Sequence, residues 1–402
     1  MSVSETFLIA LLIIFAVPYG LWRVLGGRNA LPLVVVQIIG GIVLGPGALG
    51  AVFPDYYATI FRPEVISALN GIAWWGVMLF VWLAGLELDL SEAWRQRRET
   101  GITSGLALVV PLVLGSLAAL ILVQRPGWVG PGGAAWQTVL GLGMSCAVTA
   151  LPILLMFLSN LDLMRHPLGQ RILRYASLDD IAIWVVLALI LMDVQQLSLQ
   201  LGFALFFALL AEPMRRLIPR LRETDRWAVG LIWMVGCGLF ADRAGLHYMV
   251  GAFLAGAVLD GKWFGHDRMA AFRDMLLLAL MPIFFLSAGL RTAWDMGGAS
   301  VFAAGLLLLV VSVAGKLLGV HLAGRILGWP KGEAAVIGWM LQTKALIMII
   351  FANILLDKAI ITSASFTALL LMAVGSTLLT MPIVERKLRR LGKSQANVKV
   401  GL

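Results

Sequence analysis

The chain has 402 residues, of which 60% are hydrophobic and 13% are charged, and its mean hydropathy is +0.93. These values lie far outside the usual range for soluble domains, so a lipid bilayer is the expected solvent for most of the chain. The formal net charge is +9, and the basic residues lie mainly in the connections between apolar segments. This placement is typical of loops that face anionic membrane lipid, so we do not expect nucleic acid as a partner.

Apolar stretches of membrane-spanning length fill nearly the whole sequence. A spanning helix needs about 20 mostly apolar residues, and these runs lack the polar alternation of β-barrel strands. We therefore predict an all-α integral membrane protein with 13 transmembrane helices. The predicted ranges are 6–22, 31–50, 66–88, 102–123, 136–160, 168–192, 197–214, 227–241, 246–260, 274–290, 300–324, 333–355 and 361–383.

The basic residues between these ranges alternate from one connection to the next. If the N-terminus lies outside, the inward-facing segments hold nearly all Lys and Arg, as cytoplasmic loops do. The exceptions are Arg62, Arg125, Arg243, Arg291 and Lys358 in outward-facing segments, and Lys316 and Lys344 within helices. We therefore expect a multi-pass protein of a bacterial inner membrane, with its N-terminus outside and its C-terminus in the cytoplasm.

No connection is long enough to hold a soluble domain, so residues 1–402 are predicted to form a single transmembrane domain without a soluble regulatory domain. The phosphate-binding pattern GxxxxGK[ST] is absent, and no nucleotide partner is expected. The four histidines do not group into a metal site, and we expect no cofactor. An ion gradient, rather than enzymatic chemistry, is the expected source of energy for any active transport.

Short similarities relate the two halves of the chain. Leu83–Glu87 closes the third predicted helix and Ser287–Arg291 closes the tenth, so equivalent helices are seven apart. Because seven is odd, equivalent helices point to opposite sides of the membrane, as in inverted repeats. Helices 1–6 and 8–13 are predicted to form these repeats, with the helix at 197–214 as the link between them.

Two equivalent helices, the fifth and the twelfth, carry polar interruptions near mid-membrane. The first has Ser145, Thr149 and Pro152, and the second has Thr343 and Lys344. Proline removes a backbone donor, and broken helices expose carbonyls and helix-end dipoles that bind ions. The alternative is an ordinary proline kink together with a lysine that neutralises a helix end.

Nearly all acidic residues lie in loops or at the ends of the predicted helices. The exceptions are Asp179 and Asp180, near the middle of the sixth helix. An ionised side chain at mid-bilayer costs about 2.5–3.5 kcal/mol on insertion scales, so intramembrane carboxylates usually have a partner and a function. The candidate partners are Lys316 in the eleventh helix and Lys344 at the break of the twelfth. The structural alternative is a buried salt bridge that holds helices together.

Carboxylates in this setting can bind either a proton or a hard monovalent cation. Competition between the two would couple cation movement to proton movement, so we predict a secondary active cation/proton antiporter. The remaining alternatives are a passive channel and an organic-solute symporter with a similar fold.

The chain resembles the monovalent cation:proton antiporter-2 family, which contains sodium/proton exchangers and Kef-like potassium/proton exchangers. The resemblance rests on Leu31-Pro32 to Gly45-Pro46, Leu83 to Leu88, Thr149 to Pro152, Asp179-Asp180, Gly245 to His247 with Gly251 to Phe253, Pro282 to Leu290, and Thr343-Lys344. It implies crossed broken helices 5 and 12, a separate dimerisation domain, a homodimer, elevator-like movement and a role in pH homeostasis.

The resemblance also implies roles for individual residues. Asp180 would be the essential ligand of the monovalent cation and of the proton, and Asp179 would pair with Lys316. It implies electrogenic Na⁺/H⁺ exchange, with Li⁺ or K⁺ as alternative cations. Family members often carry a glutamate where this sequence has Met348, and this departure weakens the assignment of sodium.

Overall fold

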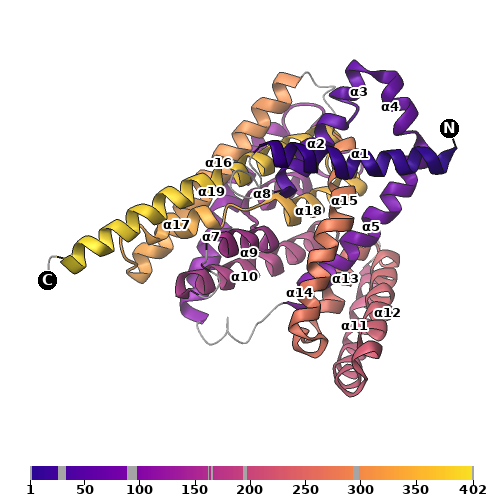
Figure 1. Ribbon diagram of the computed structural model, residues 1–402. Helices are drawn as coiled ribbons and strands as arrows, with labels where there is room; N and C mark the ends of the chain where they lie inside the picture. Colours follow the sequence, from indigo (N-terminus) through magenta and orange to yellow (C-terminus); the bar gives the residue numbers. More distant parts are fainter. Residues whose placement is uncertain are drawn as a thin grey trace. The chain divides into compact units, whose positions relative to one another are not determined.

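The computed structural model describes residues 2–25, 33–87, 97–161, 163, 166–192, 197–292 and 298–400. Side chains are described within these ranges except for Val34, Pro152, Met156, Ser159, Asn160, Ser177, Asp180, Leu197, His266 and 390–400. Nearly all regular structure in these ranges is helical (Figure 1). An antiparallel bridge between Val129 and Ile361 joins two connections.

Helices occupy every one of the predicted spanning ranges. In the first part of the chain they are α1 (Val3–Val24), α2 (Leu33–Leu44), α3 (Leu49–Val52), α4 (Pro54–Ile60), α5 (Pro63–Leu86), α7 (Arg97–Leu122), α8 (Ala135–Ala147), α9 (Leu151–Asn160) and α10 (Pro167–Ile190). They continue with α11 (Leu197–Leu217), η3 (Ile218–Arg220), α12 (Glu223–Arg243), α13 (Tyr248–Ala257), η4 (Gly261–Phe264), α14 (His266–Met275), the π-helical turn η5 (Leu276–Leu280), α15 (Met281–Leu290), α16 (Gly298–Leu327), α17 (Glu333–Met340), α18 (Ala345–Asp357) and α19 (Ser363–Val400).

Among the described residues, seven helical stretches are long and apolar enough to cross a membrane, two of them composed of consecutive elements (Val35–Val52 and Asp267–Leu290), and the bent pair α17–α18 makes an eighth. The multi-pass architecture is thereby confirmed, whereas the number of 13 crossings stays a prediction.

Two predicted ranges differ from the bounds of the helices that occupy them, and each difference has a local cause. The second range was predicted to reach residue 50, but α2 ends at Leu44, immediately before Gly45-Pro46, because proline lacks a backbone donor and disfavours helix at the residue before it. The last range was predicted to stop at residue 383, but α19 continues to Val400, since Lys, Arg and Glu propagate a helix well outside apolar surroundings.

The chain forms two compact units, each assembled from separate stretches of sequence. The first unit comprises residues 1–25, 36–89 and 187–290, and the second comprises 26–35, 90–186 and 291–402. The first unit therefore contains most of predicted spans 1–3 and 8–10, together with α11. The second unit contains predicted spans 4–6 and 11–13, apart from the end of span 6. The inverted relationship between the repeats stays a prediction.

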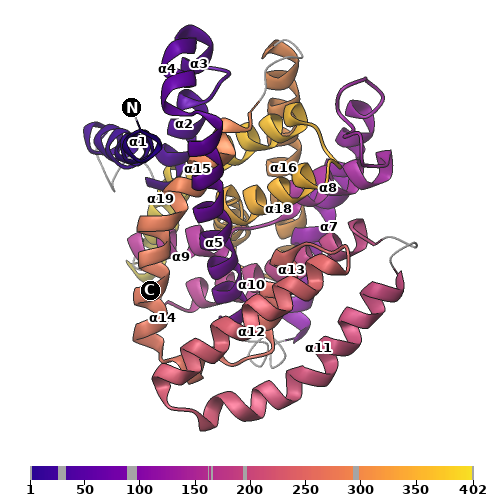
Figure 2. The same cartoon turned by 90° about the vertical axis from the view of Figure 1, so that its right-hand side faces the viewer.

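In the first unit, α5 packs against α13 and α15, and α12 lies between α11 and α13 (Figure 2). Its core contains an aromatic cluster in which Trp82 meets Phe264 edge to face, with ring centroids 5.6 Å apart. Trp227 contacts both rings, at centroid distances of 6.0 Å from Trp82 and 5.3 Å from Phe264. Edge-to-face pairs of this kind add to the stabilisation from apolar burial.

In the second unit, α16 packs along α7 and α19, and α7 also packs against α8 (Figure 1). The close approach of α16 to α7 depends on Gly315, because a Cβ atom there would lie 2.6 Å from Pro111 Cα. Small residues allow such close backbone packing between membrane helices. This contact places the following residue, Lys316, in the interior of the unit.

Candidate functional site

The predicted interruptions of the fifth and twelfth helices are present, and they lie against each other. The helix is interrupted between α8 and α9, where Val148 is extended (φ −64°, ψ 151°), and α17 and α18 are bent by 45° at their break. The Ala150 N–H donates to the Thr343 carbonyl, and Thr343 Oγ1 donates to the Ala150 carbonyl at 3.5 Å. Each break therefore satisfies backbone groups that the other has released from its helix.

Lys344 lies at the centre of this crossing and is fully buried. Its Nζ atom donates to the carbonyls of Cys146, at 2.6 Å, and Val148, at 3.0 Å. These carbonyls belong to the C-terminal end of α8, where unpaired carbonyls give the helix dipole its negative pole. Lys344 thus neutralises a helix end, which is the structural role considered from the sequence.

Asp179, on α10, forms a buried ion pair with Lys316, on α16. Lys316 Nζ lies 2.9 Å from Asp179 Oδ2, and the two side chains are 0% and 2% exposed. Lys316, and not Lys344, is therefore the described partner of this carboxylate. The ammonium compensates for the burial of the carboxylate, so a cation that binds Asp179 must compete with Lys316.

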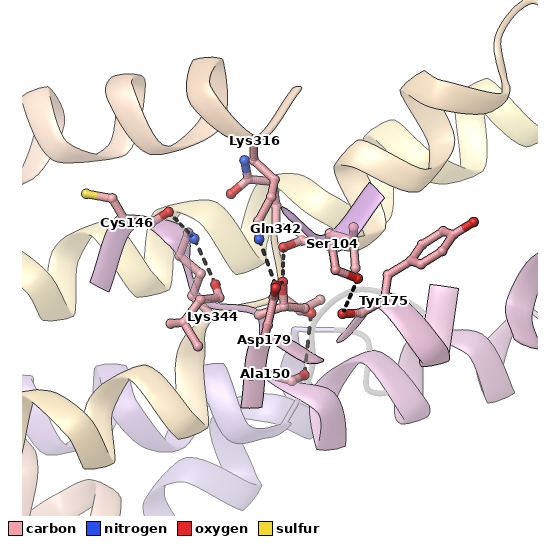
Figure 3. Close-up of polar contacts among 12 residues, drawn as sticks. Ser104, Cys146, Ala150, Tyr175, Asp179, Lys316, Gln342 and Lys344 are labelled. Atoms are coloured by element: carbon pink, nitrogen blue, oxygen red, sulfur yellow. Dashed lines mark hydrogen bonds and ion pairs between the residues drawn. The ribbon is translucent and has the colours of Figure 1, made fainter. Parts of the chain in front are cut away.

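Figure 3 shows the ion pair between Asp179 and Lys316, and Thr149 connects this pair to both helix breaks. Its Oγ1 atom lies 2.6 Å from Asp179 Oδ2 and 2.8 Å from the carbonyl of Leu341, the residue that follows α17. Thr149 itself belongs to the break between α8 and α9. A single hydroxyl group therefore contacts both the carboxylate and the end of one half-helix.

The remaining residues predicted for the site have different positions. Asp180 follows Asp179 within α10, but its side chain lies outside those that the structure describes, as does that of Pro152. Ser145 is buried, and its hydroxyl donates to the Gly141 carbonyl within α8, at 2.9 Å. Thr343 also donates to the Met340 carbonyl, at 3.2 Å. Ser145 and Thr343 therefore support the helices around the break, whereas Thr149 contacts the carboxylate.

A polar cluster at the start of α10 was not predicted from the sequence. Arg171 pairs with Glu99 of α7 at 2.7 Å and with Glu333 of α17, and its guanidinium lies 4.8 Å from the ring centroid of Trp329. The Tyr175 hydroxyl also donates to Glu99. These residues are far apart in the sequence and each reads as an ordinary helix-end residue, so no local pattern could have shown that they meet.

The site consists of a buried carboxylate, a competing ammonium and two interrupted helices, with a second aspartate adjacent in sequence. Such an arrangement can exchange one cationic partner for another at a buried carboxylate. A protein-family model described as "Sodium/hydrogen exchanger, transmembrane" matches residues 9–386. The chain belongs to this family.

Two curated antiporters are similar to this chain over most of its length. Na(+)/H(+) antiporter NhaS4 of Synechocystis is 28% identical over 392 residues, which cover 91% of this chain and 94% of that relative. Cation/H(+) antiporter 20 of Arabidopsis thaliana is 27% identical over 421 residues, covering 92% of this chain and 48% of the plant protein. The chain thus spans about half the length of the plant relatives that it matches.

A solved structure has the same fold. The sodium proton antiporter MjNhaP1 of Methanocaldococcus jannaschii aligns with a TM-score of 0.60 over 95% of this chain and 97% of that protein, at 16% sequence identity. At this level of identity the match establishes the fold, but it does not assign a role to any residue of this chain. The predicted antiporter fold is confirmed by this match.

Proposed function

We propose that the chain is a secondary active antiporter that exchanges a monovalent cation for protons. The buried Asp179–Lys316 pair beside two crossed helix breaks is the observation that carries this proposal. Family membership and the names of the relatives support it. Sodium is the leading candidate for the cation, with lithium and potassium as alternatives.

In the proposed cycle, the Asp179-Asp180 pair binds protons from one side of the membrane and a cation from the other. A dehydrated cation needs oxygen ligands, which the carboxylates provide, and it competes with protons for the same atoms. Lys316 offsets the charge of Asp179 while no cation is bound, so the interior never contains an isolated carboxylate at this position. Asp180 is proposed as the essential ligand of both the cation and the proton.

Further features are proposed from the sequence and from the resemblance. We propose an electrogenic exchanger in a bacterial inner membrane, with the N-terminus outside, the C-terminus in the cytoplasm and membrane lipid bound to the basic loops. We also propose a homodimer and a role in pH homeostasis. No nucleotide is proposed as a partner.

Transport by the purified full chain in proteoliposomes tests this function. Cation-dependent release of a preformed proton gradient would be followed with a fluorescent pH indicator while sodium, lithium, potassium or rubidium is titrated. Parallel assays with valinomycin and potassium clamp the membrane potential and reveal net charge movement. We expect release with at least one of these ions, and a rate that depends on membrane potential if exchange is electrogenic.

Asp180→Asn is expected to abolish the cation-dependent signal, because an amide cannot exchange a proton for a cation. Glu212→Gln is the matched control, since the Glu212 side chain is 55% exposed on α11 and forms an ion pair within that helix. Exchange by Asp180→Asn at the unsubstituted rate would refute the proposed role of this residue. A flux far above the turnover of carriers would indicate a channel instead.

A further inference from the structure

Only one of the two polar atoms in the Gln342 side chain has a hydrogen-bond partner among the described residues. The residue is 0% exposed and lies at the break between α17 and α18. Its Nε2 atom donates to the carbonyls of Ser312, at 3.1 Å, and Val313, at 3.3 Å, on α16. Because both partners are acceptors, the amide nitrogen must face them, and this fixes the orientation of the amide. Oε1 has no hydrogen-bond partner among the described residues.

A buried acceptor without a partner is unfavourable, so a donor or an ion that reaches it in another state would stabilise that state. Oε1 is a neutral amide oxygen, which suits an ammonium or a metal cation. Gln342 therefore offers an open acceptor position inside the second unit of the fold.

Lys316 is a buried cationic group on the helix that holds the Gln342 amide, whereas the ammonium of Lys344 is bound to the Cys146 and Val148 carbonyls. Side chains of an α-helix lean towards the preceding turn, and the turn that precedes Lys316 contains Ser312 and Val313, whose carbonyls hold the Gln342 amide. Figure 3 shows Gln342, Lys316 and Asp179 in the same group of side chains. An ammonium has three N–H donors, and in this structure one of them is directed at Asp179 Oδ2.

We propose that Gln342 Oε1 is a second acceptor for the Lys316 ammonium, which it receives when the transported cation takes Asp179. This inference rests on the proposed exchange function. In the state described here, Lys316 donates to Asp179; in the cation-bound state, it donates to Gln342. The ammonium remains charged and hydrogen-bonded in both states, so cation binding does not leave an unpaired charge in the protein interior.

The chemistry of the two acceptors explains why the exchange can be reversed. A carboxylate binds an ammonium more strongly than a neutral amide does, so Lys316 returns to Asp179 when the cation leaves. The amide nevertheless lowers the free energy of the displaced state compared with an apolar neighbour. Gln342 is thus a positioning residue that acts on cation affinity through Lys316.

Substitution of Gln342 by methionine tests the proposal, since methionine has a similar length but no oxygen acceptor. Binding by the purified full chain would be measured as the rise in melting temperature with sodium, lithium or potassium concentration. We expect Gln342→Met to raise the half-saturating cation concentration by about tenfold, the effect of one hydrogen bond to a charged group. Gln37→Met is the matched control, because Gln37 in α2 also has a buried Oε1 without a described partner but belongs to the other unit, and it should leave the half-saturating concentration unchanged.

The same substitution in a Lys316→Met background separates this role from direct cation binding. If Gln342 acts through the ammonium, Gln342→Met has no further effect on cation affinity once Lys316 is gone. A second tenfold loss in that background would make Gln342 a cation ligand and overturn the proposal. An unchanged affinity in the single variant would also overturn it.

A structure of the unsubstituted protein at saturating cation provides an independent test that does not depend on variant stability. Lys316 Nζ should lie about 3 Å from Gln342 Oε1, and its continued contact with Asp179 in the cation-bound state would overturn the proposal. Failure of every alkali cation to stabilise the unsubstituted protein or to drive exchange would instead refute the proposed function. The two failures are therefore distinguishable.

Discussion

Removal of both members of the Asp179–Lys316 pair is expected to destabilise the protein less than removal of either one. The pair is joined at 2.9 Å and almost fully buried, so each single substitution leaves the other group without its described counter-charge. The relevant variants are Asp179→Asn, Lys316→Met and the combination of the two. Asparagine and methionine preserve approximate volume, and this limits the contribution of cavities.

Breaking a buried ion pair from one side typically costs about 3–5 kcal/mol, whereas replacing both partners by neutral groups is often close to neutral. For a unit of roughly 200 residues, 1 kcal/mol corresponds to about 2–4 °C in melting temperature. Each single variant should therefore melt roughly 6 °C or more below the unsubstituted protein. The double variant should recover most of that difference.

Melting in detergent would be followed by tryptophan fluorescence and by retention of the monodisperse species, at one fixed heating rate because unfolding is expected to be irreversible. The exposed pair between Arg216 and Glu212, with side chains 70% and 55% exposed, supplies a control. Its disruption should change stability by less than about 1 kcal/mol. A double variant of Asp179 and Lys316 whose loss equals the sum of the single losses would show that the two groups act independently, contrary to the reasoning.

Two further predictions follow from close contacts in the second unit. Gly315→Val should greatly reduce the yield of folded protein, measured by size-exclusion chromatography, because a Cβ would lie 2.6 Å from Pro111 Cα. The control is Gly101→Val in α7, where a Cβ would meet open space and the yield should be unchanged. An equal loss of yield in both variants would argue against the close helix contact. Thr149→Val should slow cation-dependent exchange by about tenfold or more through loss of the hydrogen bond to Asp179, whereas Thr149→Ser should retain most of the rate in the same proteoliposome assay. Equal rates for the valine and serine variants would show that the hydroxyl group is not needed.

The sequence alone was sufficient for the multi-pass character of the chain and for the location of the helix breaks. Long apolar runs report a low-dielectric environment directly, because a charged residue within them is costly. Pro152 and the Gln342-Thr343-Lys344 segment marked the two interruptions for the same local reasons that operate in the structure. Helix ends were less accurate, as α19 shows, because the end of an apolar segment need not be the end of a helix.

Tertiary structure decided which charged groups meet. The sequence offered two intramembrane lysines as partners for the aspartates, and packing directs Lys316 to Asp179 and Lys344 to the carbonyls at the end of α8. It also brings Thr149 between Asp179 and Leu341, and leaves the Gln342 oxygen without a described partner. Helix breaks and apolar spans arise from interactions of neighbouring residues, whereas these contacts join residues 30 to 198 positions apart and depend on how closely the helices pack.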